Sequence, residues 1–106
     1  MKTPEIVTRY LDAANRLDAP GAAECFTADA HVHDEGHDYA GPEAVRGWVA
    51  ETGRKYRPRV EVLNTNVQGA ECLLAVRVAG SFPGSPIELN YAVTLRDGKI
   101  ATLKIE

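Results

Sequence analysis

The chain has little of what marks membrane, nucleic-acid-binding and secreted proteins. No apolar run approaches the length of a membrane span, and no charged stretch followed by an apolar block marks a signal peptide. Twelve basic residues against fifteen acidic ones give a formal net charge of −3, the wrong sign for general attraction to a phosphate backbone. We therefore expect no membrane partner, no nucleic-acid partner and a cytoplasmic location.

Cysteine is also scarce. Cys25 and Cys72 lie far apart in apolar contexts and form no Cys-x-x-Cys pair, so we expect two free buried thiols in a reducing compartment. Gly-x-Ser-x-Gly, Walker-type and dinucleotide-binding glycine patterns are missing as well. The sequence accordingly predicts no bound cofactor.

The chain does contain enough apolar residues for one core. Its 106 residues, 44% hydrophobic and 25% charged, predict one globular domain over residues 1–106. A chain this short leaves much of its surface exposed, so a broad apolar sheet face would need a second subunit to cover it. We expect a homodimer that forms through the sheet.

Helical signals dominate the N-terminal part. Thr3 is expected to cap a first helix with Pro4 at its first position, and apolar residues follow at helical spacing as far as Leu17. Asp18 is expected to cap a short second helix that runs through Phe26. A short strand is predicted from Ala30 to Asp34.

A polar loop is expected after Asp34, and Gly41 and Pro42 open a third helix. The buried face of this helix is predicted to contain Val45, Trp48, Val49, Thr52 and Tyr56. From there the period changes to alternation, with antiparallel strands in meander order expected at about residues 59–67, 71–81, 87–95 and 99–105. The pattern predicts an α+β protein in which a curved sheet wraps around helices.

Three stretches carry a resemblance to a known family: Arg9-Tyr10-Leu11 through Phe26, the run 29–34, and the run 41–45. With the closing hairpin around Asp97-Gly98, they resemble the NTF2-like superfamily, especially its SnoaL-like and ketosteroid-isomerase-like members. The resemblance covers nearly the whole chain. It implies a cone in which three N-terminal helices pack on a curved mixed or antiparallel sheet and enclose a pocket.

The same resemblance implies site residues. The isomerases of the superfamily resemble this chain without gaps from Arg9 to Asp34, which places their oxyanion-hole tyrosine on Tyr10 and their catalytic aspartate on Asp34. Their third residue, a carboxylic acid kept protonated as a donor, falls on Tyr91. A phenol is already a neutral donor at pH 7, so Tyr91 can fill that role.

Alternation agrees with these placements. Asp34 shares a strand face with Val32 and Ala30, and apolar neighbours raise the pKa of a carboxylate towards that of a general base. Tyr91 shares the apolar face of its own strand with Leu89 and Val93. The expected pocket-lining residues are Phe26, Val32, Trp48, Leu89 and Val93.

Three functions remain open. In an isomerase-like enzyme, Asp34 would remove a proton next to a carbonyl while Tyr10, with Tyr91, stabilises the enolate oxygen. A SnoaL-like aldol cyclase would need a similar acid–base carboxylate. A ligand-binding or protein-interaction domain would need only the cavity, with Tyr10 a core residue and Asp34 a cap of the following loop. The expected ligand is a small, apolar, carbonyl-containing molecule.

Histidines raise one further possibility. His31 and His33 lie two apart on a predicted strand and project to the same side, where His37 or Asp34 could complete a metal site. If Asp34 points inward, however, both histidines point outward. The sequence therefore favours a polar surface pair, and we expect no metal.

Overall fold

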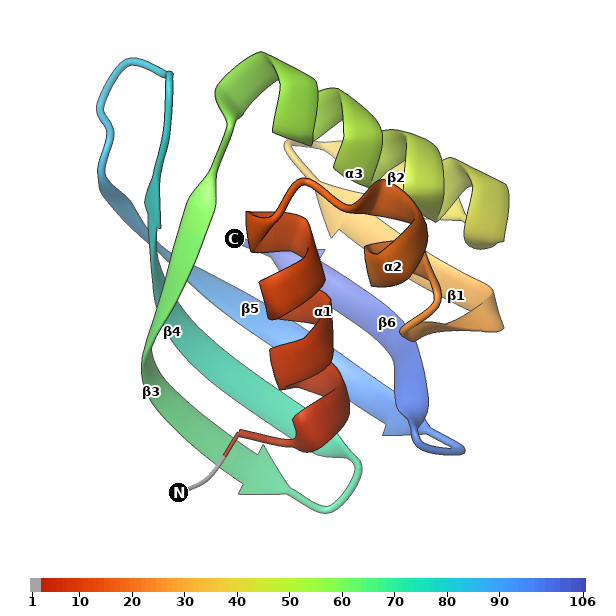
Figure 1. Cartoon of the computed structure of the whole chain (residues 1–106). Helices are drawn as coiled ribbons and strands as arrows, with labels where there is room; N and C mark the ends of the chain where they lie inside the picture. Colours follow the sequence, from red (N-terminus) through yellow and green to blue (C-terminus); the bar gives the residue numbers. More distant parts are fainter. Residues whose placement is uncertain (1–2) are drawn as a thin grey trace.

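The fold is a six-stranded curved sheet with three helices on one of its faces (Figure 1). The computed structural model describes residues 3–106. The strand order is β2-β1-β6-β5-β4-β3; β1 runs parallel to β6, and all other neighbours are antiparallel. This confirms the predicted α+β class and mixed sheet. The elements are α1 (Glu5–Asn15), α2 (Ala19–Ala23), β1 (Phe26–Asp34), β2 (His37–Ala40), α3 (Pro42–Tyr56), β3 (Arg59–Gln68), β4 (Glu71–Ala79), β5 (Ile87–Arg96) and β6 (Lys99–Ile105).

The start of the chain differs from the prediction. Pro4, not Thr3, is the N-cap of α1, and the Thr3 hydroxyl instead pairs with the Thr65 hydroxyl of β3 at 2.8 Å. Leu17 lies beyond the end of α1 with a φ of 60° and is 47% exposed, so it is no part of the buried stripe. The contact of Thr3 with the sheet and the left-handed backbone at Leu17 therefore override the cap and the helical spacing that the sequence predicted.

The short second helix begins as predicted and ends earlier. Asp18 accepts a hydrogen bond from the Gly21 amide at 3.0 Å, the capping arrangement expected of it. The helix ends at Ala23, and Phe26 is already the first residue of β1. This strand is therefore longer than the predicted Ala30–Asp34, because its first part pairs with β6 at Phe26 and Ile100.

Strand β2 was not predicted at all. It forms a tight hairpin with β1 in which Asp34 pairs with His37. The two turn residues, Glu35 and Gly36, both have positive φ angles of 53° and 77°, the conformation that a two-residue hairpin turn needs. Glycine favours this conformation and glutamate does not, so the sequence looks like a polar loop.

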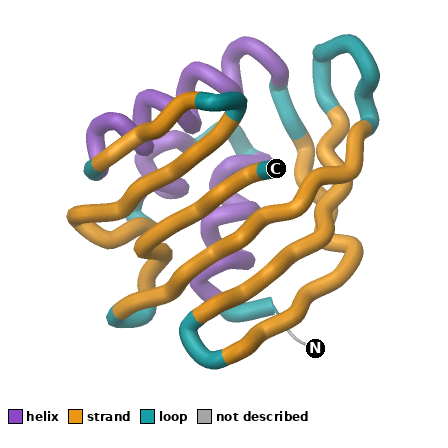
Figure 2. Tube along the Cα trace, turned by 180° about the vertical axis from the view of Figure 1, so that it is seen from behind, coloured by secondary structure: helices purple, strands orange, loops and turns teal. Residues whose placement is uncertain are grey.

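The predicted meander is confirmed in order and nearly in bounds, with β4 ending at Ala79 instead of residue 81. Asp97 and Gly98 form the turn between β5 and β6 with φ angles of 54° and 75°. Seen from behind, the sheet has no helix in front of it (Figure 2). The core therefore lies between the concave face of the sheet and the helices, where the largest fully buried side chains are those of Leu74, Ile100, Leu103, Val7, Val32, Val45 and Val76.

Candidate active site

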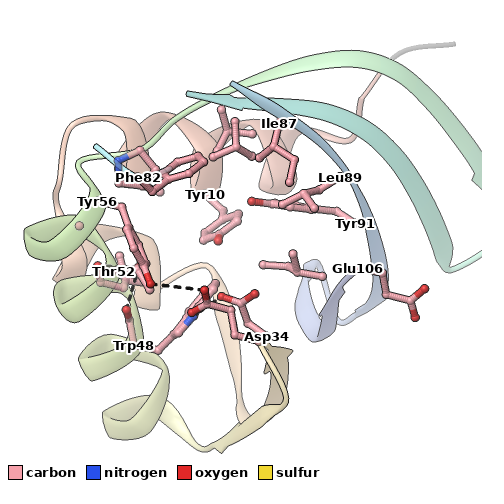
Figure 3. A pocket seen from close by; sticks show the side chains of 18 of the residues that line it. Tyr10, Asp34, Trp48, Thr52, Tyr56, Phe82, Ile87, Leu89, Tyr91 and Glu106 are labelled. Carbon is pink, nitrogen blue, oxygen red and sulfur yellow. Dashed lines mark hydrogen bonds between the residues drawn. The ribbon is translucent and has the colours of Figure 1, made fainter. Parts of the chain in front are cut away.

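A cavity of about 750 Å³ opens between the concave sheet face and helices α1 and α3 (Figure 3). This volume is within the range of small-molecule binding sites. Five of the predicted site residues are in its walls: Tyr10, Asp34, Trp48, Leu89 and Tyr91. Helix α1 carries Tyr10, β1 ends at Asp34, α3 carries Trp48, and β5 carries the other two.

The other three predicted lining residues do not reach the cavity. Phe26, Val32 and Val93 are on the inner side of the sheet, but they are almost completely buried in the packed core. Helices lie directly on this part of the sheet, so no space is left beside these side chains. Phe26 still supports the site, because its ring packs edge-on against the Tyr10 ring with centroids 5.2 Å apart.

Tyr10 and Tyr91 are buried phenols whose hydroxyls face the cavity (Figure 3). They are only 5% and 6% exposed, and within residues 3–106 neither hydroxyl has a hydrogen-bond partner. Among the described side chains, no polar atom is sealed off from both solvent and a partner, so these hydroxyls must be reached through the cavity. They are two donors available to a bound molecule.

Burial also keeps both phenols protonated. The pKa of Tyr10 is raised well above its ordinary value, first by burial and then by the negative charges that ionised Tyr91 and Asp34 would place nearby. Burial likewise raises the pKa of Tyr91, with Asp34 adding to the effect. Both groups therefore remain hydrogen-bond donors throughout the physiological pH range.

Asp34 is half-buried at the end of β1, where the hairpin turn begins. The Trp48 indole donates a hydrogen bond from Nε1 to Asp34 Oδ2 at 3.0 Å. Burial raises the pKa of Asp34, and the negative charge of Glu35 adds to the shift. The hydrogen bonds from Trp48 and from the Glu35 backbone oppose it. The result is a carboxylate held in place by an indole, with a basicity above that of an ordinary aspartate.

Three residues at one end of the cavity were not predicted as site residues from the sequence. Tyr56 donates a hydrogen bond to Glu35 Oε1 at 3.4 Å, and its ring meets the Phe82 ring edge-on with centroids 5.8 Å apart. All three residues line the cavity. Tyr56 belonged to the predicted buried face of its helix, so helical periodicity could have indicated it as a lining residue. Nothing marked Glu35, in an unrecognised turn, or Phe82, in the loop after β4.

His31 and His33 lie on the opposite side of β1, as the alternation predicted. His31 Nε2 and His33 Nδ1 are 3.2 Å and 2.8 Å from the same oxygen, Oδ1 of Asp38 on β2. All three side chains are substantially exposed. In the described part of the chain, no group of three or more His, Cys, Asp or Glu residues could hold a metal ion.

Both cysteines are buried free thiols. Burial raises the pKa of each thiol, which keeps them protonated and unreactive. None of the helices in residues 3–106 is long and apolar enough to cross a membrane.

A curved sheet that wraps three helices around a cavity defines the NTF2-like, or cystatin-like, fold. Solved structures with similar folds agree with this class. One is a protein from Catenulispora acidiphila that is described as having a ketosteroid isomerase-like fold and was solved in complex with trimethylamine. It matches with a TM-score of 0.88 and 22% identity, over 99% of this chain and 86% of that one. A cystatin-fold protein from Novosphingobium aromaticivorans matches with a TM-score of 0.82 and 18% identity over 100% of this chain and 98% of that one.

Within this class, the family is assigned by a family model. The model of the SnoaL-like domain matches residues 7–103, and the chain belongs to that family. A crystal structure from Sinorhizobium meliloti, described as a "putative polyketide cyclase", is similar over 98% of this chain and 95% of that one, with 38% identity and a TM-score of 0.94. A search of curated proteins finds no match.

Proposed function

We propose that the cavity is an active site that moves a proton at a carbon atom next to a carbonyl group. Asp34 is the general base, and Tyr10 and Tyr91 donate hydrogen bonds to the carbonyl oxygen. The observation that carries the proposal is the pair of buried phenol hydroxyls that face the cavity and have no hydrogen-bond partner among the described residues. Donors placed where charge develops are the main device by which proteins stabilise an enolate.

The reaction needs no group beyond the three side chains. The Asp34 carboxylate takes a proton from the α-carbon, and the electron pair of that C–H bond forms a C=C bond. The carbonyl π electrons move to oxygen, where the two phenols stabilise the negative charge. Protonated Asp34 can then trade its proton for a solvent deuteron and return the deuteron to the same carbon, which gives exchange. Alternatively it delivers its proton to the γ-carbon of a β,γ-unsaturated ketone, which gives the conjugated isomer.

The environment of each group fits its role. A base works best when its pKa is raised towards the working pH, and burial shifts the pKa of Asp34 in this direction. An oxyanion donor has to stay protonated, and burial raises the pKa of both tyrosines. Because most of the lining is apolar or aromatic, the substrate we propose is a small apolar carbonyl compound.

A second candidate is aldol ring closure with the same residues. Similarity at 38% identity to a protein described as a polyketide cyclase favours it. In this reaction the enolate carbon attacks a second carbonyl of the same molecule and a C–C bond forms. Asp34 then gives its proton to the new alkoxide. Both candidates begin with the same proton abstraction, so one assay tests their common step.

That assay is deuterium exchange at the α-carbon of ketones, followed by NMR, together with a panel of β,γ-unsaturated ketones and diketones. We expect exchange with the wild-type protein and a loss of roughly 10² to 10⁴ in rate in Asp34→Asn. Conjugated ketones would identify an isomerase and cyclised products a cyclase. Asp38→Asn, a carboxylate change on the other side of the same hairpin, is the matched control and should exchange at the wild-type rate.

Binding without exchange would contradict this proposal. If ketones bind in the cavity but the wild-type protein exchanges no faster than Asp34→Asn, then Asp34 is not a base. The protein would then be a ligand-binding member of its family.

A further inference from the structure

The charged groups of the cavity wall all have one sign. Of the residues that line it, Asp34, Glu35 and Glu106 are acidic and none is basic or histidine. Glu106 is paired with Lys104 at 2.9 Å, and its side chain points away from the cavity in Figure 3. Asp34 and Glu35 are therefore the charged groups that face the cavity, and no described side chain in its wall carries a positive charge that could pair with an anionic ligand.

Aromatic rings gather at the Glu35 end of the cavity. Trp48, Tyr56 and Phe82 all line it, and the Tyr56 hydroxyl contacts the Glu35 carboxylate. A ring face attracts a cation, and Trp and Tyr do so most strongly. This property is already visible in the protein, because the exposed Lys55 ammonium lies over the Tyr56 ring, 5.0 Å from its centroid.

Two basic side chains close in sequence to the wall stay outside it. Val60 lines the cavity, so Arg59, which precedes it on β3, points to the other face and is exposed. Arg57, the left-handed residue that ends α3, is also exposed and does not line the cavity. Arg54 pairs with Glu51 on the helix surface. Lys55, whose ammonium lies over the Tyr56 ring, is exposed and does not line the wall.

The two ends of the cavity therefore differ in kind. One end presents the hydroxyls of Tyr10 and Tyr91, which are buried and have no hydrogen-bond partner within residues 3–106. The other presents a carboxylate among aromatic rings. Resting on the function proposed above, we propose that the substrate carries a cationic amine, bound between Glu35 and the aromatic rings of Trp48, Tyr56 and Phe82, while its carbonyl oxygen lies between Tyr10 and Tyr91. The site would thus take amino ketones and reject keto acids.

Three matched methyl ketones test the charge preference. They share one alkyl chain and end in a trimethylammonium group, in the neutral tert-butyl isostere or in a carboxylate, and each is made in several chain lengths. Trp48 is the chain's only tryptophan and lines the cavity, so its fluorescence reports binding. We expect the ammonium ketone to bind about ten-fold more tightly than the neutral one, and the carboxylate more weakly than both.

Two variants test whether Glu35 causes the preference for the ammonium ketone. Glu35→Gln should bring the affinity of the ammonium ketone close to that of the neutral ketone and leave the neutral ketone unchanged. Glu61→Gln, which removes an exposed carboxylate on the strand face opposite Val60, should keep the full preference. Equal affinities in the wild type, tighter binding of the carboxylate, or a preference that survives in Glu35→Gln would overturn the inference.

Exchange at the α-carbon of the same probes separates this inference from the proposed function. A charge preference without exchange would support the inference and contradict the proton-transfer function. Exchange without a charge preference would do the reverse. If none of the three probes changes the Trp48 fluorescence at any chain length, the cavity does not take such ketones and the inference is wrong.

Discussion

The two faces of the sheet are made by the same strands and treat polar groups in opposite ways. On the convex face, charged side chains are exposed and paired, as in Arg77 with Glu61 at 3.9 Å. On the helix-covered side, Tyr91 is buried, and its hydroxyl forms no hydrogen bond with any described residue. A buried polar group without a partner typically costs about 1 to 3 kcal/mol. Among the described residues no sealed polar side-chain atom lacks a partner, so the Tyr91 hydroxyl is reached through the cavity, where the proposed substrate would bind.

The largest difference between the two faces is expected in the effect of tyrosine substitutions on the exchange rate. Tyr10→Phe and Tyr91→Phe should each slow α-proton exchange by roughly 10² to 10³, because each removes one oxyanion donor. In the part of the chain that the structure describes, neither hydroxyl has a hydrogen-bond partner, so the free energy of unfolding should change by less than about 1 kcal/mol. Exchange rates by NMR and urea unfolding measure the two effects.

Tyr39→Phe is the matched control for the tyrosines. Tyr39 packs beside Trp48, with ring centroids 6.1 Å apart, but does not line the cavity. Its exchange rate should equal that of the wild type. A large loss of stability without a loss of rate in Tyr10→Phe would mean that this phenol is a core residue and no oxyanion donor.

Two adjacent leucines on β4 test the faces by stability alone. Leu74 is 1% exposed on the concave side and Leu73 is 56% exposed on the convex side. Leu74→Ala should cost about 2 to 5 kcal/mol of unfolding free energy, because it leaves a cavity in the core. Leu73→Ala should change it by no more than about 0.5 kcal/mol in a monomer. Urea titrations of both variants in parallel measure the difference, and equal costs would contradict the assigned faces.

Leu73 also tests the expected homodimer. A dimer that forms through the sheet would bury this side chain against a second copy, so Leu73→Glu should weaken association by about ten-fold or more. Sedimentation equilibrium over a range of concentrations measures the effect. A wild-type protein that stays monomeric at every concentration would show that the convex face is a solvent surface and that the predicted dimer is wrong.

The sequence predicted the parts of the fold that depend on periodicity and turn chemistry. Alternation placed Asp34 and Tyr91 on the inner face, and Asp97-Gly98 marked its hairpin, because these signals are local. The turn at Glu35-Gly36 was missed because a glutamate with positive φ is held by pairing across the hairpin, which no local pattern shows. Without that turn, strand β2 looked like a loop.

The site residues likewise divide into those that had a signal in the sequence and those that had none. Tyr10 and Asp34 were found because a family resemblance fixed their spacing, and their roles stay a proposal. Phe26 and Val93 are on the predicted inner face of the sheet but are buried in the core instead of lining the cavity. Alternation predicts the side of a sheet on which a residue lies and cannot predict where the helices leave a gap. Phe82 comes from a loop and had no periodic signal at all.

The smallest expected effect is on the pH dependence of stability, which should differ in sign between two aspartates of the β1–β2 hairpin. Burial raises the pKa of Asp34 from its ordinary value of 3.8. A raised pKa means that the folded state loses stability as the pH rises through that pKa. Asp34→Asn should therefore melt at the same temperature as the wild type near pH 3 and at a higher temperature than the wild type at neutral pH.

Asp38, on the convex side, should show the opposite sign. Its hydrogen bond from His33 holds the pKa of this carboxyl below 3.8, so its ionised form stabilises the folded state above that pH, and the gain is lost as the pH falls through the lowered pKa. Asp38→Asn should melt slightly below the wild type at pH 5 and approach it at lower pH, with a small effect because the pair is exposed. Melting curves of both variants from pH 3 to 7 compare the signs. If Asp34→Asn melts below the wild type at neutral pH, the sign expected of Asp38→Asn, then Asp34 is a stabilising paired carboxylate and not a base with a pKa raised by burial.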